Sequence, residues 1–270
     1  MPSTLRQPAV AGRFYPASRD KLSHQVLEFV PEVAEKIAAV GCIAPHAGYV
    51  YSGHVAGAVY AHLALPRRHI ILCPNHTGFG ETLSIMSHGA WLTPLGETPI
   101  DTVLARNLQN AFTQLHEDTL AHESEHAIEV QLPFLQTLVP DFTFVPIAVG
   151  TNRLDYLESL GRAMALTIRE SKEPVLMIAS SDMNHYESDS ATRAKDRMAI
   201  ESILRLDPRQ LYEVVADERI SMCGMGCSVA MLTAARLLGA THAKLIKYAT
   251  SADVSGDYDH CVGYAGVIVS

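Results

Sequence analysis

A turn between a strand and a helix is predicted in the stretch Ile43-Ala44-Pro45-His46-Ala47-Gly48-Tyr49-Val50-Tyr51-Ser52-Gly53. The apolar run at 40–44 is typical of a short strand, and Pro45 ends it because proline has no backbone N–H to donate. Ser52 is a good N-cap for a helix, since apolar residues recur at helical spacing after it. His46 is therefore expected at the carboxyl end of a strand, where open α/β sheets bind their ligands.

The same pattern occurs twice more along the chain. An apolar run at 70–73 ends at Pro74-Asn75-His76-Thr77-Gly78, and a run at 175–179 ends at Ser180-Ser181-Asp182-Met183-Asn184-His185. Continuous apolar runs of this kind are typical of strands that are covered on both faces. The chain thus places a histidine shortly after each of three predicted buried strands.

Strands alternate with amphipathic helices along the whole chain, and the connections between them are short. This order predicts an α/β fold with a mixed or mostly parallel central sheet and helices on both faces. No shift in composition marks a linker, so we expect a single domain over residues 1–270. A further helix is predicted to start at Thr98-Pro99, and a helix or helix pair is predicted over 122–138.

The composition excludes several classes of protein. The chain is 48% hydrophobic and 19% charged, as ordinary globular domains are. Its net charge of −8 argues against binding to nucleic acid or to an anionic membrane, because both are negatively charged. Residues 1–7 are polar and lack the apolar core of a signal peptide, and no apolar run approaches the ~20 residues needed to span a bilayer. Five cysteines, an odd number, suit a reducing compartment. We therefore expect a cytoplasmic protein without nucleic-acid or membrane partners.

Candidate metal ligands follow from the turns after the strands. His46, His76 and His185 come from three such turns, and Cys223 comes from a glycine-rich turn before a helix. If the strands are parallel, these side chains converge at one edge of the sheet, where two imidazoles and one anionic ligand would leave positions open on a divalent metal. Each could instead be an ordinary turn or core residue. Cys227 is the weaker cysteine candidate because it lies inside the predicted helix.

Two patterns suggest acid–base chemistry. The sequence His122-Glu123-Ser124-Glu125-His126 matches the H-E-x-x-H motif of zinc proteases formally, but it lacks a convincing third ligand downstream. A better role for His126 is that of a pocket acid or base, held by Glu125 or Glu129. Asp182 and His185 could form a carboxylate–imidazole pair for proton transfer, although Asp182 could also cap the strand exit in an Asx turn. Nucleotide-binding P-loops, G-x-G-x-x-G and G-x-S-x-G motifs do not occur.

The chain resembles the MEMO family over essentially its whole length. The motifs that carry the resemblance occur in the family's order: Arg6 to Pro16, Pro45-His46-Ala47-Gly48-Tyr49, Pro74-Asn75-His76, Glu125 to Phe134, Ser180 to His185, Cys223-Gly224 and Gly263-Tyr264-Ala265. The resemblance implies a fold similar to the class III extradiol dioxygenases of the LigB type, which hold non-haem Fe(II) with two histidines and a glutamate.

Carried over by position, the resemblance makes His46 and His76 metal ligands and puts Cys223 in the place of the glutamate. His185 matches the catalytic histidine, and His126 matches a pocket histidine. Non-haem Fe(II) is the implied cofactor, with Cu or Zn as alternatives because a thiolate is softer than a carboxylate. Prokaryotic family members are often found with an AMMECR1-like protein and a radical SAM protein, which suggests a shared pathway.

Two hypotheses on function result. The first is a metal-dependent oxidoreductase or dioxygenase, with His46, His76 and Cys223 as ligands and with His185, His126 and Asp182 moving protons on a small aromatic or enolic substrate. The second is a non-catalytic module that binds a peptide or partner protein through the same cleft, having lost the chemistry together with the glutamate.

Overall fold

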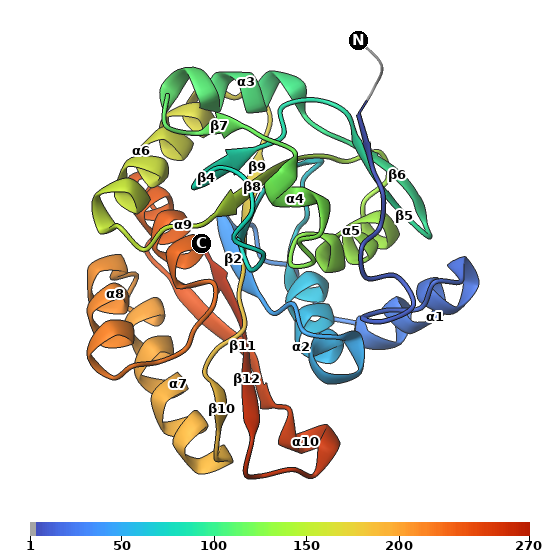
Figure 1. Cartoon of the computed structure of the whole chain (residues 1–270), viewed down its shortest axis with the longest axis vertical. Coiled ribbons are helices and arrows are strands. Elements are labelled where there is room, and N and C mark those ends of the chain that lie inside the picture. The colour runs from blue at the N-terminus through green and yellow to red at the C-terminus, as the bar shows by residue number, and fades with distance from the viewer. Residues whose placement is uncertain (1–3) are drawn as a thin grey trace.

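Four buried parallel strands form the centre of the protein. The computed structural model describes residues 4–270, so the first three residues of the polar stretch at 1–7 lie outside the described part. The central strands are β2 (Gly41–Ala44), β9 (Val175–Ser180), β3 (Arg68–Pro74) and β8 (Thr143–Val149), adjacent in that order. All run parallel, so their carboxyl ends meet at one edge of the sheet. Figure 1 shows β2, β8 and β9 at the centre of the molecule.

Further strands, joined to the central four by antiparallel pairing, extend the sheet on both sides. The nine-stranded sheet has the order β10-β12-β2-β9-β3-β8-β4-β7, and β11 pairs with β12 outside this path. The added strands are β4 (Leu83–Ile85), β7 (His116–Glu117), β10 (His185–Glu187), β11 (Ala243–Thr250) and β12 (Cys261–Val269). Because β12 is antiparallel to β2, and β4 to β8, the sheet is mixed. A second, small sheet contains β1 (Leu5–Arg6), β5 (Ala90–Thr93) and β6 (Gly96–Pro99).

Alternate residues of the central strands belong to two separate hydrophobic cores. In β3, Ile70 and Leu72 pack into one core, whereas Ile71 and Cys73 pack into the other. Successive side chains of a strand point to opposite faces, so a continuous apolar run can bury both faces of the sheet. The predicted α/β fold with a mixed sheet and helices on both faces is confirmed.

Each core is closed by its own layer of helices. The first layer consists of α3 (Thr102–Ala111), α6 (Leu154–Glu170), α7 (Asp189–Leu204), α8 (Pro208–Asp217) and α9 (Met225–Leu237). The second layer consists of α1 (Arg19–Phe29), α2 (Tyr49–His62) and α5 (Leu132–Leu138). Short elements complete the chain: α4 (Leu120–Glu123), η1 (Glu129–Gln131) and α10 (Ala252–Ser255). Among residues 4–270, every helix is too short or too polar to cross a bilayer.

Two predicted helix starts are wrong. Helix α2 begins at Tyr49 rather than after Ser52, and the Ser52 hydroxyl donates to the carbonyl of Ala47 within the first turn. The Thr98-Pro99 pair belongs to strand β6, and α3 begins later with Asp101 as its N-cap, which accepts the N–H of Leu104 at 3.0 Å. The N-cap of α2 is Gly48, which makes no side-chain capping bond, so a search for capping side chains could not locate this helix start.

Candidate metal centre

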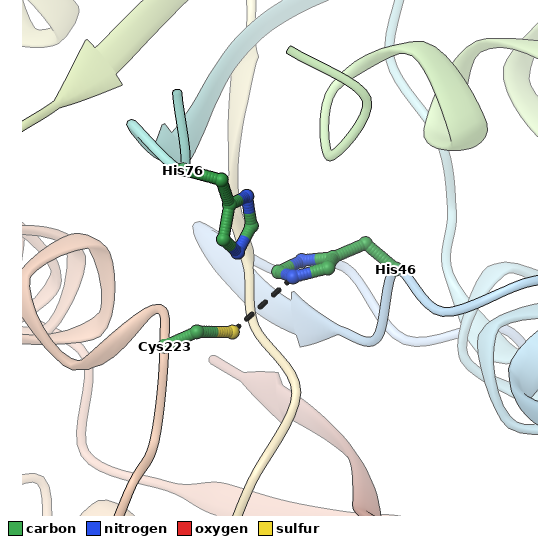
Figure 2. Close-up of side chains that lie close together, drawn as sticks. All are labelled: His46, His76 and Cys223. Carbon is green, nitrogen blue, oxygen red and sulfur yellow. Dashed lines mark hydrogen bonds between the residues drawn. The ribbon is translucent and has the colours of Figure 1, made fainter. Parts of the chain in front are cut away.

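Two imidazoles and one sulfur converge at the carboxyl edge of the central strands. His46 follows β2, His76 follows β3, and Cys223 comes directly before Gly224, the N-cap of α9. Figure 2 shows the three side chains pointing toward one another, and their ligand atoms all lie within 4.8 Å of each other. The closest pair is the Cys223 Sγ and the His46 Nε2, at 3.2 Å. The predicted convergence is confirmed, whereas metal binding by these residues stays a prediction.

His46 is oriented by a buried relay of hydrogen bonds. Its Nδ1 lies 3.0 Å from the Ser180 Oγ, at the end of β9. The Ser180 hydroxyl donates its single proton to the carbonyl of Ala127 at 2.7 Å and accepts a hydrogen bond from the Gln131 Nε2 at 2.9 Å. Since that proton is already used, the Nδ1 of His46 must carry a hydrogen and donate it to Ser180. The Nε2 of His46 then carries the lone pair, which faces the Sγ of Cys223 at 3.2 Å.

The environment of His46 also keeps its ring neutral. Only 2% of the residue is exposed, and burial lowers its pKa to about 3, with the neighbouring charge of His76 acting in the same direction. A neutral imidazole is the form that binds a metal ion.

His76 is oriented by the carboxylate of Glu125. The ring Nδ1 of His76 lies 2.9 Å from one carboxylate oxygen, and the backbone N–H of His76 donates to the other at 2.7 Å. Although burial opposes ionisation of Glu125, the hydrogen bond and the charge of His76 lower the pKa of the carboxyl to about 2. An ionised Glu125 makes the Nδ1 of His76 the donor and, against burial, raises the pKa of His76. The Nε2 of His76 can bind a metal when the ring is neutral.

A second group, His76, Glu125 and His126, also has its ligand atoms within 4.8 Å of one another. Its carboxylate is already occupied, because the backbone N–H groups of His126 and Ala127 donate to the same oxygen as the ring of His76, at 2.8 and 3.0 Å. We therefore interpret this group as an orienting cluster for the two rings and not as a second cation site.

His126 lies against both other imidazoles. Its ring stacks on that of His76, with centroids 4.8 Å apart and planes inclined by 22°, and its Nδ1 lies 3.3 Å from Glu125. Burial lowers the pKa of His126 to about 4, helped by the charge of His46, so the ring is neutral at pH 7. Of the two carboxylates considered from the sequence, Glu125 is its partner. Glu129 instead pairs with Arg6 and accepts the Tyr15 hydroxyl at 2.5 Å.

A close approach of the backbone places Cys223. A Cβ on Gly224 would clash with the Ser181 side chain and the Ser180 carbonyl, so only glycine lets the start of α9 lie against the end of β9. The N–H of Gly224 donates to the Ser181 Oγ at 3.1 Å, which fixes this contact. Burial and the nearby Asp182 carboxylate raise the pKa of the Cys223 thiol well above its usual range.

Asp182 and His185 do not form the predicted carboxylate–imidazole pair. Asp182 accepts the backbone N–H of His46 at 2.7 Å, and its second oxygen lies 4.0 Å from the His46 Nε2. The Nδ1 of His185 lies 2.9 Å from the carbonyl of Ser221, so it donates to that carbonyl. The expectation is wrong because His185 is not part of the turn after β9. It is the first residue of the separate strand β10.

The H-E-x-x-H match is not a zinc-protease helix. Helix α4 ends at Glu123, so His122 and His126 do not lie one turn apart on the same helix. His122 is fully buried beside Trp91, with ring centroids 5.8 Å apart, and within residues 4–270 neither of its ring nitrogens has a hydrogen-bond partner. The metalloprotease interpretation is therefore excluded by geometry.

Sequence reasoning missed the residues that orient the ligands. Ser180 and Gln131 are polar residues inside otherwise apolar surroundings, and both are fully buried. That contrast is the one signal in the sequence that could have identified them, because buried polar groups require partners. Cys227 is buried in α9, inside a helix as predicted, and Cys42 and Cys73 are core residues of the strands.

Comparisons with known proteins agree along the whole chain. Residues 6–268 match the family described as Memo-like protein. MEMO1 family proteins of Pyrobaculum arsenaticum and Methanosarcina barkeri are 41% and 42% identical, over 98% of this chain and 98% and 100% of theirs. A MEMO1 family protein of Thermotoga neapolitana is 40% identical over 98% of this chain and all of its own.

A solved structure shares the fold at low sequence identity. The crystal structure of an uncharacterized protein from Escherichia coli K12 superposes with a TM-score of 0.57 over 84% of this chain and 98% of that one, at 11% identity. The full-length matches to MEMO1 family proteins bear out the resemblance seen in the sequence motifs. This chain belongs to the family of Memo-like proteins.

Proposed function

We propose that the chain is a metal-dependent oxidoreductase whose metal is held by His46, His76 and Cys223. The observation that supports this is the convergence of the three ligand atoms within 4.8 Å. Each imidazole turns its Nδ1 to a buried partner, Ser180 or Glu125, as metal-ligating histidines almost always do. Nitrogen and sulfur ligands of a tetrahedral metal are roughly 3.5 Å apart, which is close to the separation of the Sγ and Nε2 atoms.

The donor set suits a catalytic centre rather than a structural one. Two imidazoles and one thiolate leave coordination positions open, which a catalytic metal requires. A bound divalent cation would favour the thiolate of Cys223, offsetting the burial that raises its pKa. Family resemblance favours Fe(II), and the sulfur ligand makes Cu or Zn the alternatives. Such an ion supplies a Lewis acid or a redox centre for the reaction.

We assign proton transfer to three groups beside the ligands. His126 is neutral at pH 7 and can accept a proton, while Glu125 holds its Nδ1. His185 has its Nδ1 bound to a backbone carbonyl, which leaves its Nε2 to exchange a proton with a substrate. Asp182, whose pKa is raised by burial, positions His46 through the backbone and is the third candidate. The substrate would be a small aromatic or enolic molecule. An AMMECR1-like protein and a radical SAM protein are proposed partners, from the resemblance alone.

Metal analysis of protein purified without tags or chelators tests the proposal. We expect stoichiometric metal in the unaltered protein and its loss in His46→Ala and Cys223→Ala. His24→Ala is the matched control, because His24 lies on the surface of α1 and should leave the metal content unchanged. The proposal would be contradicted if the unaltered protein contained no metal and His46→Ala had the same metal content. That result would favour the alternative, a module that binds a peptide or partner protein.

A further inference from the structure

Tyr186 adopts a backbone conformation that tyrosine rarely takes. Among residues 4–270, four residues other than glycine have positive φ: Asp141, Tyr186, Leu206 and Arg219. Leu206 and Arg219 come one position after the C-caps of α7 and α8, where a left-handed residue commonly ends a helix. Asp141 is of a type that tolerates this region. Tyr186, with φ of 61°, lies instead inside strand β10, so neither explanation applies to it.

Contacts on both sides hold Tyr186 in this conformation. The pairing of β10 with β12 shifts register between His185 and Glu187, which makes Tyr186 the bulged residue. The backbone N–H of His185 donates to the Ser221 Oγ at 2.7 Å. The carboxylate of Glu187 pairs with the ammonium of Lys195 at 2.8 Å. Strained residues persist where their surroundings fix them in this way, and they cluster at functional sites.

The side chain of Tyr186 does not compensate for the strain by packing. The residue is 76% exposed, and its one aromatic neighbour within residues 4–270 is the ring of His185, with centroids 5.6 Å apart. An exposed aromatic ring on a strained backbone contributes little to folding, so another role must maintain it. The Nδ1 of His185 lies 2.9 Å from the carbonyl of Ser221, two residues before Cys223, which places the His185–Tyr186 pair beside the candidate metal centre.

We infer that Tyr186 is a specificity-determining residue, whose ring packs against a planar, unsaturated ligand bound beside His185. The inference rests on the proposed function, because the metal centre would hold the ligand. The bulge in β10 is then what keeps the ring exposed beside the ring of His185, at a cost in backbone strain. Aromatic rings stack on planar ligands with little loss of side-chain freedom, which suits an exposed tyrosine to this role.

Four proteins test the inference: the unaltered chain, Tyr186→Asn, Tyr186→Phe and Asp141→Asn. The probe is 4-nitrocatechol, titrated by absorbance into the metal-loaded proteins. Tyr186→Asn should weaken probe binding about tenfold, because an aromatic contact is lost. It should also raise Tm by about 2–4 °C, because asparagine tolerates positive φ better. Tyr186→Phe keeps the ring and should bind the probe like the unaltered chain.

Asp141→Asn is the control for an asparagine at positive φ away from the site. Asp141 precedes β8 at the opposite end of the sheet from the site, so this change should leave probe binding unaltered. Unchanged probe binding or a lower Tm in Tyr186→Asn would overturn the inference. Metal-loaded protein that does not bind 4-nitrocatechol would also overturn it while leaving the metal centre intact. Protein that takes up no metal would overturn the proposed function as well.

Discussion

The carboxylate of Glu125 accepts hydrogen bonds from both the backbone N–H and the ring Nδ1 of His76, at 2.7 and 2.9 Å. This two-point contact fixes the position of the His76 main chain and the tautomer of its ring together. Glu125 is fully buried and 49 residues away in sequence, and its carboxylate also accepts two backbone N–H groups of its own loop and lies 3.3 Å from the His126 Nδ1. The orientation of the His76 ring thus depends on Glu125, a residue that would not itself contact the metal.

Glu125→Gln should weaken metal binding by about 10- to 100-fold, the usual effect of removing a carboxylate behind a histidine ligand. Glutamine offers one acceptor oxygen where the N–H groups around position 125 require two. Competition with a chromophoric chelator measures the affinity. Glu123→Gln is the control, because Glu123 is exposed at the end of α4 and should have no effect. Equal affinities of the two variants would contradict the role of Glu125.

Ser180→Ala should destabilise the protein and weaken its metal site. The change leaves the Nδ1 of His46 and the amide of Gln131 without their buried acceptor, at a cost of about 1–3 kcal/mol in the free energy of unfolding. Ser228→Ala is the matched control, because within residues 4–270 the buried Ser228 Oγ has no hydrogen-bond partner. Urea denaturation of both variants compares the costs, and a loss as large in Ser228→Ala would argue against the relay.

The central sheet and the convergence of the ligands are predictable because they depend on local patterns. Continuous apolar runs identify the buried strands, and the parallel arrangement brings His46 and His76 to one edge. The position of Cys223 beside them follows from the glycine after it, which permits close packing of α9.

The hydrogen bonds that orient the ligands could not be predicted, because they join distant parts of the chain. Ser180 is 134 residues from His46, and no local pattern indicates which buried hydroxyl meets which ring. The same reason explains the missing Asp182–His185 pair. Proximity in sequence suggested that pair, but pairing of His185 with Val262 of β12 takes it into a separate strand.

Arg6→Met should lower the free energy of unfolding and disturb the loop that carries Glu125. Arg6 forms a buried ion pair with Glu129 and donates to the backbone carbonyls of His122 and Glu125, at 3.1 and 2.7 Å. Removing one partner of a buried pair costs about 3–5 kcal/mol because it leaves the other charge uncompensated. Arg13→Met, at an exposed position, should change the free energy of unfolding by less than about 0.5 kcal/mol. Thermal and urea denaturation check both values, and similar costs in the two variants would contradict the prediction.

Titration of the Asp196 carboxyl should lower the free energy of unfolding as pH rises from about 4 to 7. Its carboxyl is fully buried, accepts the N–H of Asn184 at 2.8 Å and the Tyr248 hydroxyl at 2.7 Å, and has its pKa raised to about 7 by burial. Between the ordinary and the raised pKa, the folded state holds a proton that the unfolded state has released. The free energy of unfolding therefore falls by up to about 1.4 kcal/mol per pH unit across this window and levels off above it. Asp196→Asn removes the titration, so its stability should depend less on pH between 4 and 7. Urea denaturation across this range measures the difference, and parallel curves for the two proteins would refute the assignment.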